Sequence, residues 1–170
     1  MSTEFEMKNL GGLKYFLEIE VARSKNGIFL SQWKYVLDLL MEVGLLKCKP
    51  VDTPILQNHR LGEYSNQVPA DKVRYQRLVG KLIYLSHTHP DIVYAISVVS
   101  QFMHNPSKDY MGVVIRILRY LKSSPGKGLI FSKNAHPNIE GYIDADWAGK
   151  ILDIKSTSSY FTFVRGNLVT

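Results

Sequence analysis

The alternation of apolar and polar residues predicts a β-hairpin followed by a helix near the start of the chain. Residues 14–21 are typical of a strand, with apolar side chains at alternate positions and glutamates on the other face. Asn26-Gly27 is a strong hairpin signal because both residues tolerate a positive φ, and residues 28–30 supply the returning strand. Ser31 is expected to cap the helix and Gly44 to end it. The apolar positions of this helix are spaced by three or four residues: Val36, Leu39, Leu40 and Val43.

Three further helices are predicted after a segment rich in proline and polar residues. Residues 49–69 contain three prolines together with glycine, serine and asparagine, which indicates a loop or linker and the best candidate domain boundary. Asp71 is expected to cap the first helix, the second begins near Pro90, and Ser107 is expected to cap the third. Their predicted buried positions are Tyr75, Leu78, Val79 and Leu82; Ile92, Ala95, Ile96, Val99, Phe102 and Met103; and Met111, Val114, Ile115 and Leu118.

The pattern returns to β-structure after the turn at Pro125-Gly126. Apolar runs predict strands at 129–131, 139–143, 159–164 and 168–170, and Arg165-Gly166-Asn167 is a tight-turn signal. The sequence stops inside the last apolar run, so we expect a truncated domain that ends in an unpaired edge strand. Because an unpaired edge exposes backbone donors and acceptors, we also expect self-association through this strand.

Composition places the chain among ordinary globular proteins of one or two domains. It has 170 residues, of which 45% are hydrophobic and 21% charged. Cys48 is the single cysteine, which excludes an intrachain disulfide and a cysteine-based zinc site. The start of the chain lacks a signal-peptide pattern, and no apolar stretch approaches the ~20 residues that span a bilayer. The expected location is therefore intracellular, either cytoplasmic or nuclear, with no secretion and no membrane partner.

Positive charge is concentrated in the middle of the chain. Residues 71–133 contain ten lysines and arginines against three aspartates, a surplus of +7, whereas the rest of the chain has 11 against 12 acidic residues. Such a surplus indicates a polyanionic partner, most simply a nucleic-acid backbone, although a solvated helix surface is the alternative. Arg116, Arg119 and Lys122 recur every third residue and are expected to share one polar flank of the third helix.

Asp144 and Asp146 are the sharpest candidates for chemistry. Two residues apart on a predicted strand, they are expected on the same face, where paired carboxylates can hold Mg²⁺ as in two-metal nucleases. Acidic residues at a strand end are more often solvated or turn-forming, so the pair alone does not establish a metal site. His87 and His89 flank a predicted helix end, where a polar surface role or a carbonyl contact is expected. The sequence contains no zinc-protease histidine pair, no phosphate-binding glycine loop and no Gly-x-Ser-x-Gly elbow.

Ten segments follow one another along the chain in a recognisable order. They are Phe5–Gly11, Leu13–Leu17 with Ile19–Val21, Ile28–Gln32 with Lys34-Tyr35, Lys49–Pro54, Tyr75–Leu85, Pro90–Ile92, Arg116–Lys122, Gly141-Tyr142, Asp144–Gly149 and Ser156–Ser158. Together they resemble the copia-type retrotransposon reverse transcriptases and the RNase H domain that follows them. The resemblance covers nearly the whole chain and is far more specific than any one motif.

The resemblance implies an α+β fold in four parts. Residues 1–48 would be a palm remnant with a β-hairpin and helix, 49–70 a linker, 71–124 the helical thumb and connection, and 125–170 a truncated RNase H-like domain with a partial β-sheet. The partner implied is an RNA–DNA hybrid, held beside the helices while DNA is synthesised. The cations expected to contact it are Arg74, Arg77, Lys81, Arg116, Arg119 and Lys122.

The family also implies which catalytic groups are present and which are missing. Asp144 matches the first metal-ligand aspartate of the RNase H fold, and Asp146 is the second aspartate of the same motif. The polymerase Tyr-x-Asp-Asp sequence is absent, and the helix with the next RNase H glutamate would follow Thr170. Mg²⁺ is therefore the cofactor of the intact enzyme, and this chain alone is expected to be inactive and to bind no metal tightly.

The sequence also departs from the family pattern inside its motifs. Glu18 and Arg165 stand where the family usually has glycine, and Trp33 and His89 stand where it usually has arginine. These departures are typical of an element copy that has drifted. Two other interpretations therefore stay open: a stand-alone, non-specific nucleic-acid-binding module, and a decayed transposon product without function.

Overall fold

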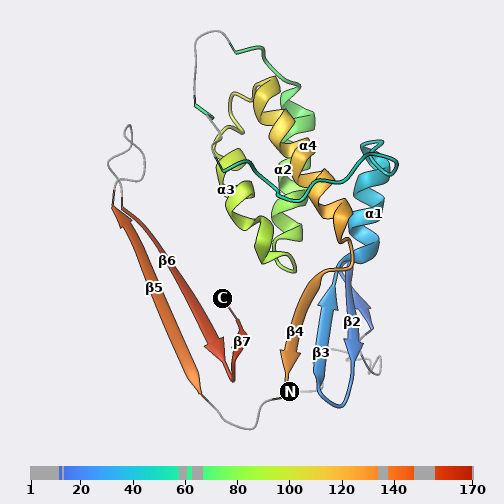
Figure 1. The fold of residues 1–170 in the computed structure, drawn as a ribbon, viewed down its shortest axis with the longest axis vertical. Helices are drawn as coiled ribbons and strands as arrows, with labels where there is room; N and C mark the ends of the chain where they lie inside the picture. The colour runs from blue at the N-terminus through green and yellow to red at the C-terminus, as the bar shows by residue number, and fades with distance from the viewer. Residues whose placement is uncertain are drawn as a thin grey trace, which may run out of the picture. The chain divides into compact units, whose positions relative to one another are not determined.

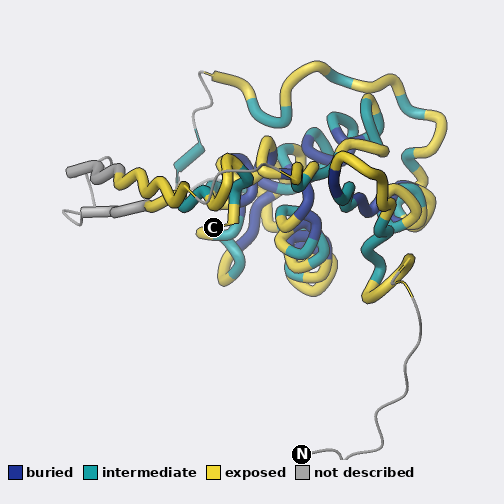
Figure 2. The backbone as a smooth tube through the Cα atoms, turned by 90° about the horizontal axis from the view of Figure 1, so that it is seen from below, coloured by how far each residue is buried: buried dark blue, intermediate teal, exposed yellow. Residues whose placement is uncertain are grey.

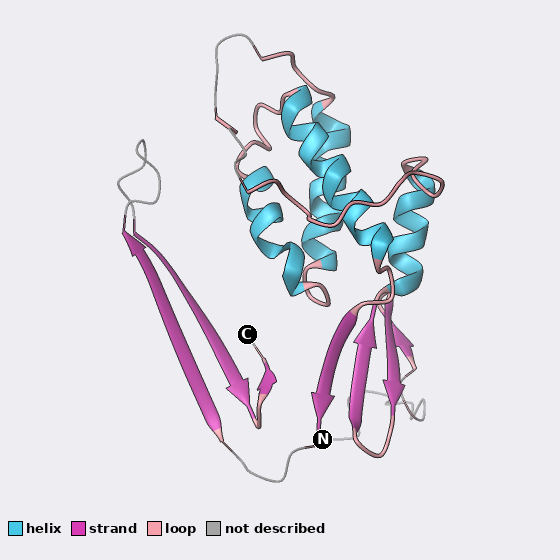
Figure 3. Ribbon diagram, viewed as in Figure 1, coloured by secondary structure: helices cyan, strands magenta, loops and turns pink. Residues whose placement is uncertain are grey.

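The computed structural model describes Gly12 and residues 14–57, 61–62, 67–133, 138–147 and 156–169, with the backbone alone described at 144–147 and 156–159. Within these residues the chain combines α-helices with two antiparallel sheets, which confirms the predicted mixture of helix and sheet (Figures 1 and 3). The elements are β1 (Tyr15–Phe16), β2 (Ile19–Arg23), β3 (Gly27–Ser31), α1 (Trp33–Glu42), α2 (Lys72–Leu85), the 3₁₀ helix η1 (Pro90–Ile92), α3 (Val93–Ser100), α4 (Lys108–Ser123), β4 (Gly128–Ser132), β5 (Ile139–Trp147), β6 (Ser156–Val164) and β7 (Asn167–Leu168).

The chain divides into two compact units. The first comprises Met1–Val21 and Leu30–Leu129, and the second comprises Ala22–Phe29 and Ile130–Thr170. The predicted boundaries on either side of the 49–70 segment do not coincide with this division. The reason is that α1 shares one hydrophobic core with the three later helices, so the helices before and after that segment belong to the same unit.

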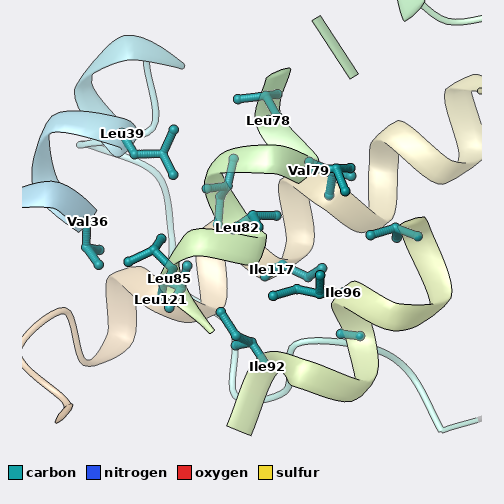
Figure 4. Close-up of a cluster of buried hydrophobic side chains, with 14 of the residues drawn as sticks. Val36, Leu39, Leu78, Val79, Leu82, Leu85, Ile92, Ile96, Ile117 and Leu121 are labelled. Carbon is teal, nitrogen blue, oxygen red and sulfur yellow. The ribbon is translucent and has the colours of Figure 1, made fainter. Parts of the chain in front are cut away.

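The core of the first unit is built from the apolar faces of α1, α2, η1, α3 and α4 (Figure 4). The buried stripes predicted for α1 and α2 are confirmed, except that Val43 is only partly buried. On α4 the prediction missed three buried residues, Tyr110, Ile117 and Leu121. Because α4 packs against α1, α2 and α3 together, its buried face is wider than a single stripe at helical spacing.

Helix ends follow the predicted capping signals at three of four positions. Asp71 accepts a hydrogen bond from the Arg74 amide at 3.0 Å, and Ser107 accepts one from the Tyr110 amide at 3.5 Å. Gly44, with φ 73°, ends α1 in a Schellman arrangement, in which the Leu45 amide donates to the Leu40 carbonyl at 2.8 Å.

The prediction that Ser31 caps α1 is wrong. Strand β3 continues through Ser31, and Gln32 takes the N-cap position without a side-chain capping bond. The Gln32 side chain instead accepts a hydrogen bond from the distant Thr88 hydroxyl.

The first predicted strand is in fact a tight hairpin. Leu17 and Glu18 have φ values of 47° and 61°, and they reverse the chain so that β1 pairs with β2 in the register Tyr15↔Glu20. The Tyr84 hydroxyl donates to the Leu17 carbonyl and fixes the turn against α2. The period-2 pattern did not reveal the turn because neither residue is a typical turn former.

The two sheets have the strand orders β1-β2-β3-β4 and β5-β6-β7. β5 and β6 pair from Ile139↔Val164 to Trp147↔Ser156, and the described residues of this pair are mostly exposed (Figure 2). The predicted turn at Arg165-Gly166 is confirmed, with φ values of 54° and 69°. The last strand is not unpaired as predicted, because Leu168 pairs with Phe163 of β6; Thr170 lies outside the described residues.

Candidate nucleic-acid interface

Two of the six predicted binding cations pair with one glutamate. The Arg77 guanidinium lies 3.0 Å from a carboxylate oxygen of Glu42, and the Lys81 ammonium donates a hydrogen bond to the other oxygen. The hydrogen bond from Lys81 lowers the pKa of Glu42, so the carboxylate stays ionised. Glu42 is at the end of α1, far from α2 in sequence, and no sequence pattern pointed to it. These two cations therefore join α1 to α2.

Arg74 differs from these two residues. It is exposed near the start of α2, and within the described part of the chain its guanidinium forms no ion pair or hydrogen bond. Its charge is directed to solvent.

The three predicted cations of α4 share one flank, as expected, but the flank is covered by another part of the chain. The Arg116 guanidinium donates to the Thr53 hydroxyl at 2.9 Å, the Arg119 Nε donates to the Lys49 carbonyl at 2.9 Å, and the Lys122 ammonium donates to the Cys48 carbonyl. We call residues 48–53 the strap. All three acceptors are uncharged oxygens, so the strap accepts one hydrogen bond from each cation without neutralising its charge.

Other described parts of the predicted linker also contact α4. The Tyr110 hydroxyl donates to the Gly62 carbonyl at 2.6 Å, and the Lys108 amide donates to the Val68 carbonyl at 2.8 Å. The strap contacts the C-terminal half of α4, whereas these contacts lie at its N-terminal end. The described parts of the 49–70 segment thus run antiparallel to α4 and cover one side of it (Figure 3).

A buried polar cluster lies where α1 begins and α2 ends. The Thr88 hydroxyl donates to the Gln32 side-chain oxygen at 2.8 Å and lies 3.0 Å from Nδ1 of His89. The tautomer of His89 sets the direction of its hydrogen bond with Thr88. The predicted surface role of His89 is wrong, since its side chain is 1% exposed and burial lowers its pKa.

An ion pair lies beside this cluster. The Tyr120 hydroxyl donates to the Asp91 carboxylate at 2.5 Å, and the Lys127 ammonium donates to the same oxygen at 3.1 Å. Lys127 also lies over the Tyr120 ring, 5.1 Å from its centroid. Hydrogen bonds to Tyr120 and Asp91 raise the pKa of Lys127. The three residues connect η1 to the end of α4.

The predicted metal pair lies on a regular part of β5. Asp144 pairs with Ser159 and Asp146 pairs with Thr157 in the β5–β6 register, but the side chains of all four residues lie outside the description. Among the side chains that are described, no group of three His, Cys, Asp or Glu residues could hold a metal ion.

Comparison with known proteins gives the family. A family model described as reverse transcriptase (RNA-dependent DNA polymerase) matches residues 1–57. The Retrovirus-related Pol polyprotein from transposon RE1 of Arabidopsis thaliana is 40% identical over 164 residues, which is 96% of this chain. An uncharacterized mitochondrial protein of the same plant is 37% identical over the whole chain and over 70% of its own length. The chain belongs to the copia-type retrotransposon Pol polyprotein family.

The Pol polyproteins are much longer than this chain. The chain spans 11% of the RE1 polyprotein and 13% of the Pol polyprotein from transposon TNT 1-94 of Nicotiana tabacum, to which it is 36% identical. The similarity to these Pol polyproteins extends through the four helices and both sheets, beyond the part that the reverse transcriptase model matches. No solved structure matches the chain significantly. None of the described helices is long and apolar enough to cross a membrane.

Proposed function

We propose that this chain is the part of a copia-type Pol polyprotein that holds the RNA–DNA template–primer duplex, and that it binds such duplexes without reading their sequence. The observation that carries the proposal is the surplus of +7 on residues 71–133 in a member of a reverse transcriptase family. Lysine and arginine contacts to phosphates release condensed counterions and supply most of the affinity of non-specific complexes.

The α4 flank supports this proposal through the nature of its present partners. Arg116, Arg119 and Lys122 are bound to hydroxyl and carbonyl oxygens, and within the described residues none of them forms an ion pair. Charged phosphate oxygens accept stronger hydrogen bonds from such cations than neutral oxygens do. A duplex can therefore take over these donors from the strap, with the solvent-directed Arg74 as a further contact.

The parts of the chain have distinct roles in this proposal. The hairpin β2–β3 with α1 is the palm remnant, α2–α4 are the thumb and connection, and β5–β7 begin the RNase H-like sheet. Asp144 and Asp146 would hold Mg²⁺ in the intact enzyme, where the ion activates water to cut the RNA strand. Their alternate positions on one strand suit a carboxylate pair, but two carboxylates leave most of the coordination shell to water. The chain alone is thus a binding fragment and not a nuclease or polymerase.

The proposal is tested by comparing the salt dependence of hybrid binding in two variants. The first replaces Arg116, Arg119 and Lys122 together by Gln, which keeps helix propensity and removes three charges. If all three contact phosphates, the slope of log affinity against log salt flattens by about two to three units. A thermal melt followed by circular dichroism verifies that the variant is folded.

The control replaces Glu42, Arg77 and Lys81 together by Gln, which removes a cluster of the same size whose two cations share one carboxylate. We expect it to change the slope by less than one unit, because its net charge falls by only one. An unchanged slope in the α4 variant would contradict the role proposed for this flank.

A further inference from the structure

A second set of cations lies in the second unit and includes none of the predicted binding residues. Arg23 ends β2, Lys25 lies in the turn between β2 and β3, and Lys133 directly follows β4. The Lys133 amide donates to the Asn26 carbonyl at 2.9 Å, which places the end of β4 beside the turn. All three side chains are exposed. Segments about 110 residues apart in sequence therefore bring three cations to one end of a sheet.

The turn that carries Lys25 is held by its own hydrogen bonds. The Ser24 amide donates to the Gly27 carbonyl at 2.9 Å, and the Asn26 amide donates to the Ser24 hydroxyl at 3.1 Å. Gly27 also permits the close approach of β4, because a Cβ at this position would lie 2.2 Å from the Phe131 carbonyl oxygen. The cations therefore lie on a hydrogen-bonded turn and on the closely paired strands beside it.

A neighbouring turn is attached to the same end of β4. The Asn167 side chain accepts a hydrogen bond from the Ser132 amide at 2.6 Å and donates one to the Ser132 carbonyl at 3.0 Å. The Asn167 side chain thus bonds both the amide and the carbonyl of Ser132, as a neighbouring strand would, and holds the residue that precedes Lys133 in place.

The two short segments that carry these cations contain no acidic residue, since Asp and Glu are absent from residues 22–29 and 128–133. Within the described residues, the side chains of Arg23, Lys25 and Lys133 form no ion pair or hydrogen bond. They differ in this respect from Arg77 and Lys81, which both pair with Glu42. Unopposed cations on an ordered surface attract a polyanion most strongly.

We propose that Arg23, Lys25 and Lys133 form a phosphate-binding surface for the backbone of a nucleic-acid duplex. This inference rests on the proposed function but places a contact outside the α4 flank. Three cations without base-reading groups around them position a backbone and do not select a sequence. The surface needs no rearrangement of the strap, because no other part of the described chain covers these side chains.

The test replaces Arg23, Lys25 and Lys133 together by Gln and measures binding of a labelled RNA–DNA hybrid over a range of salt concentrations. We expect the slope of log affinity against log salt to flatten by about two to three units. The matched control replaces Lys14, Lys34 and Lys47 by Gln, which removes three exposed charges from the first unit and should change the slope by less than one unit.

The outcomes separate this inference from the proposed function. A wild-type chain that does not bind the hybrid overturns both. Binding with a wild-type slope in the Arg23/Lys25/Lys133 variant, or equal flattening in the control, overturns the inference and leaves the proposed function intact. Preferential binding to anionic lipid vesicles over the hybrid also overturns it.

A second measurement needs no substitution. Bound hybrid should protect the Lys25 and Lys133 amines from acetylation and leave Lys47 reactive. Equal acetylation of all three with and without hybrid would contradict the proposed surface.

Discussion

At the scale of single residues, Glu18 adopts a backbone conformation that favours glycine. Its φ of 61° is in the left-handed region, which costs most residues roughly 1–2 kcal/mol. The Tyr15 hydroxyl donates to the Glu18 carboxylate, and this hydrogen bond raises the pKa of Tyr15 to about 12. Both groups are exposed, so the bond compensates only a small part of the cost. The resemblance to copia-type enzymes, which usually have glycine here, fits this conformation.

Replacing Glu18 by Gly should therefore stabilise the chain. We expect the free energy of unfolding in urea to rise by about 0.5–1 kcal/mol, since the strain is relieved and one exposed hydrogen bond is lost. The control Glu20→Gly, in the extended strand β2, should lower it, because Glu20 also accepts a hydrogen bond from the Lys34 amide at 3.1 Å. A less stable Glu18→Gly variant would contradict the account of this turn.

His89 should make stability depend on pH. Burial lowers its pKa below the ordinary value of 6.5, so below that pH the unfolded chain binds a proton that the folded chain resists. Nearby Asp91 opposes this shift and Lys127 adds to it. The free energy of unfolding keeps its full value above about pH 6.5. It decreases as the pH drops toward the pKa of His89 in the folded chain, by at most about 1.4 kcal/mol per pH unit.

Urea unfolding between about pH 7.5 and 5.5 measures this effect, a window that brackets the ordinary histidine pKa. His89→Gln should flatten the dependence, whereas His87→Gln, at an exposed position, should leave it unchanged. The same pH dependence in both variants would show that His89 is not responsible.

At the scale of elements, the sequence predicted the features that depend on neighbouring residues. It did not predict the contacts between residues that are distant in sequence. Asp71, Ser107 and Gly44 act at helix ends through hydrogen bonds to neighbouring residues, so their roles can be read from a few positions. The strap bonds join α4 to residues about 60–75 positions earlier, and no spacing rule anticipates them. The burial of His89 has the same origin, because its hydrogen-bond partner Thr88 also binds Gln32, 56 positions earlier in the chain.

The hydrogen bonds that hold the strap should control how fast trypsin cuts the chain there. Arg119→Ala removes the donor to the Lys49 carbonyl, and a lost hydrogen bond of about 1 kcal/mol raises the open population of the strap about fivefold. Trypsin should then cut after Lys47, at the start of the strap, several times faster than in the wild type. Arg74→Ala, which also removes one cleavage site but no bond of its side chain, should leave the rate unchanged. Equal rates in the two variants would mean that Arg119 does not secure the strap.

At the scale of the whole molecule, the sequence allowed the family and the mixture of helix and sheet to be predicted. It could not show which cations have an acidic partner. Arg77 and Lys81 are opposed by a glutamate of another helix, whereas Arg23, Lys25 and Lys133 converge through sheet pairing. A charge count over residues 71–133 includes Lys133 but omits the hairpin cations beside it. The assignment of Asp144 and Asp146 to a metal site remains a prediction.

The central claim is that this chain holds an RNA–DNA duplex through its phosphates. The most direct test is the affinity of the wild-type protein for a labelled hybrid, measured from about 50 to 200 mM salt with two hybrids of unrelated sequence. For three to six phosphate contacts, the slope of log affinity against log salt should lie between about −3 and −5 and be the same for both hybrids. An affinity that does not change with salt, or that depends strongly on sequence, would contradict the claim.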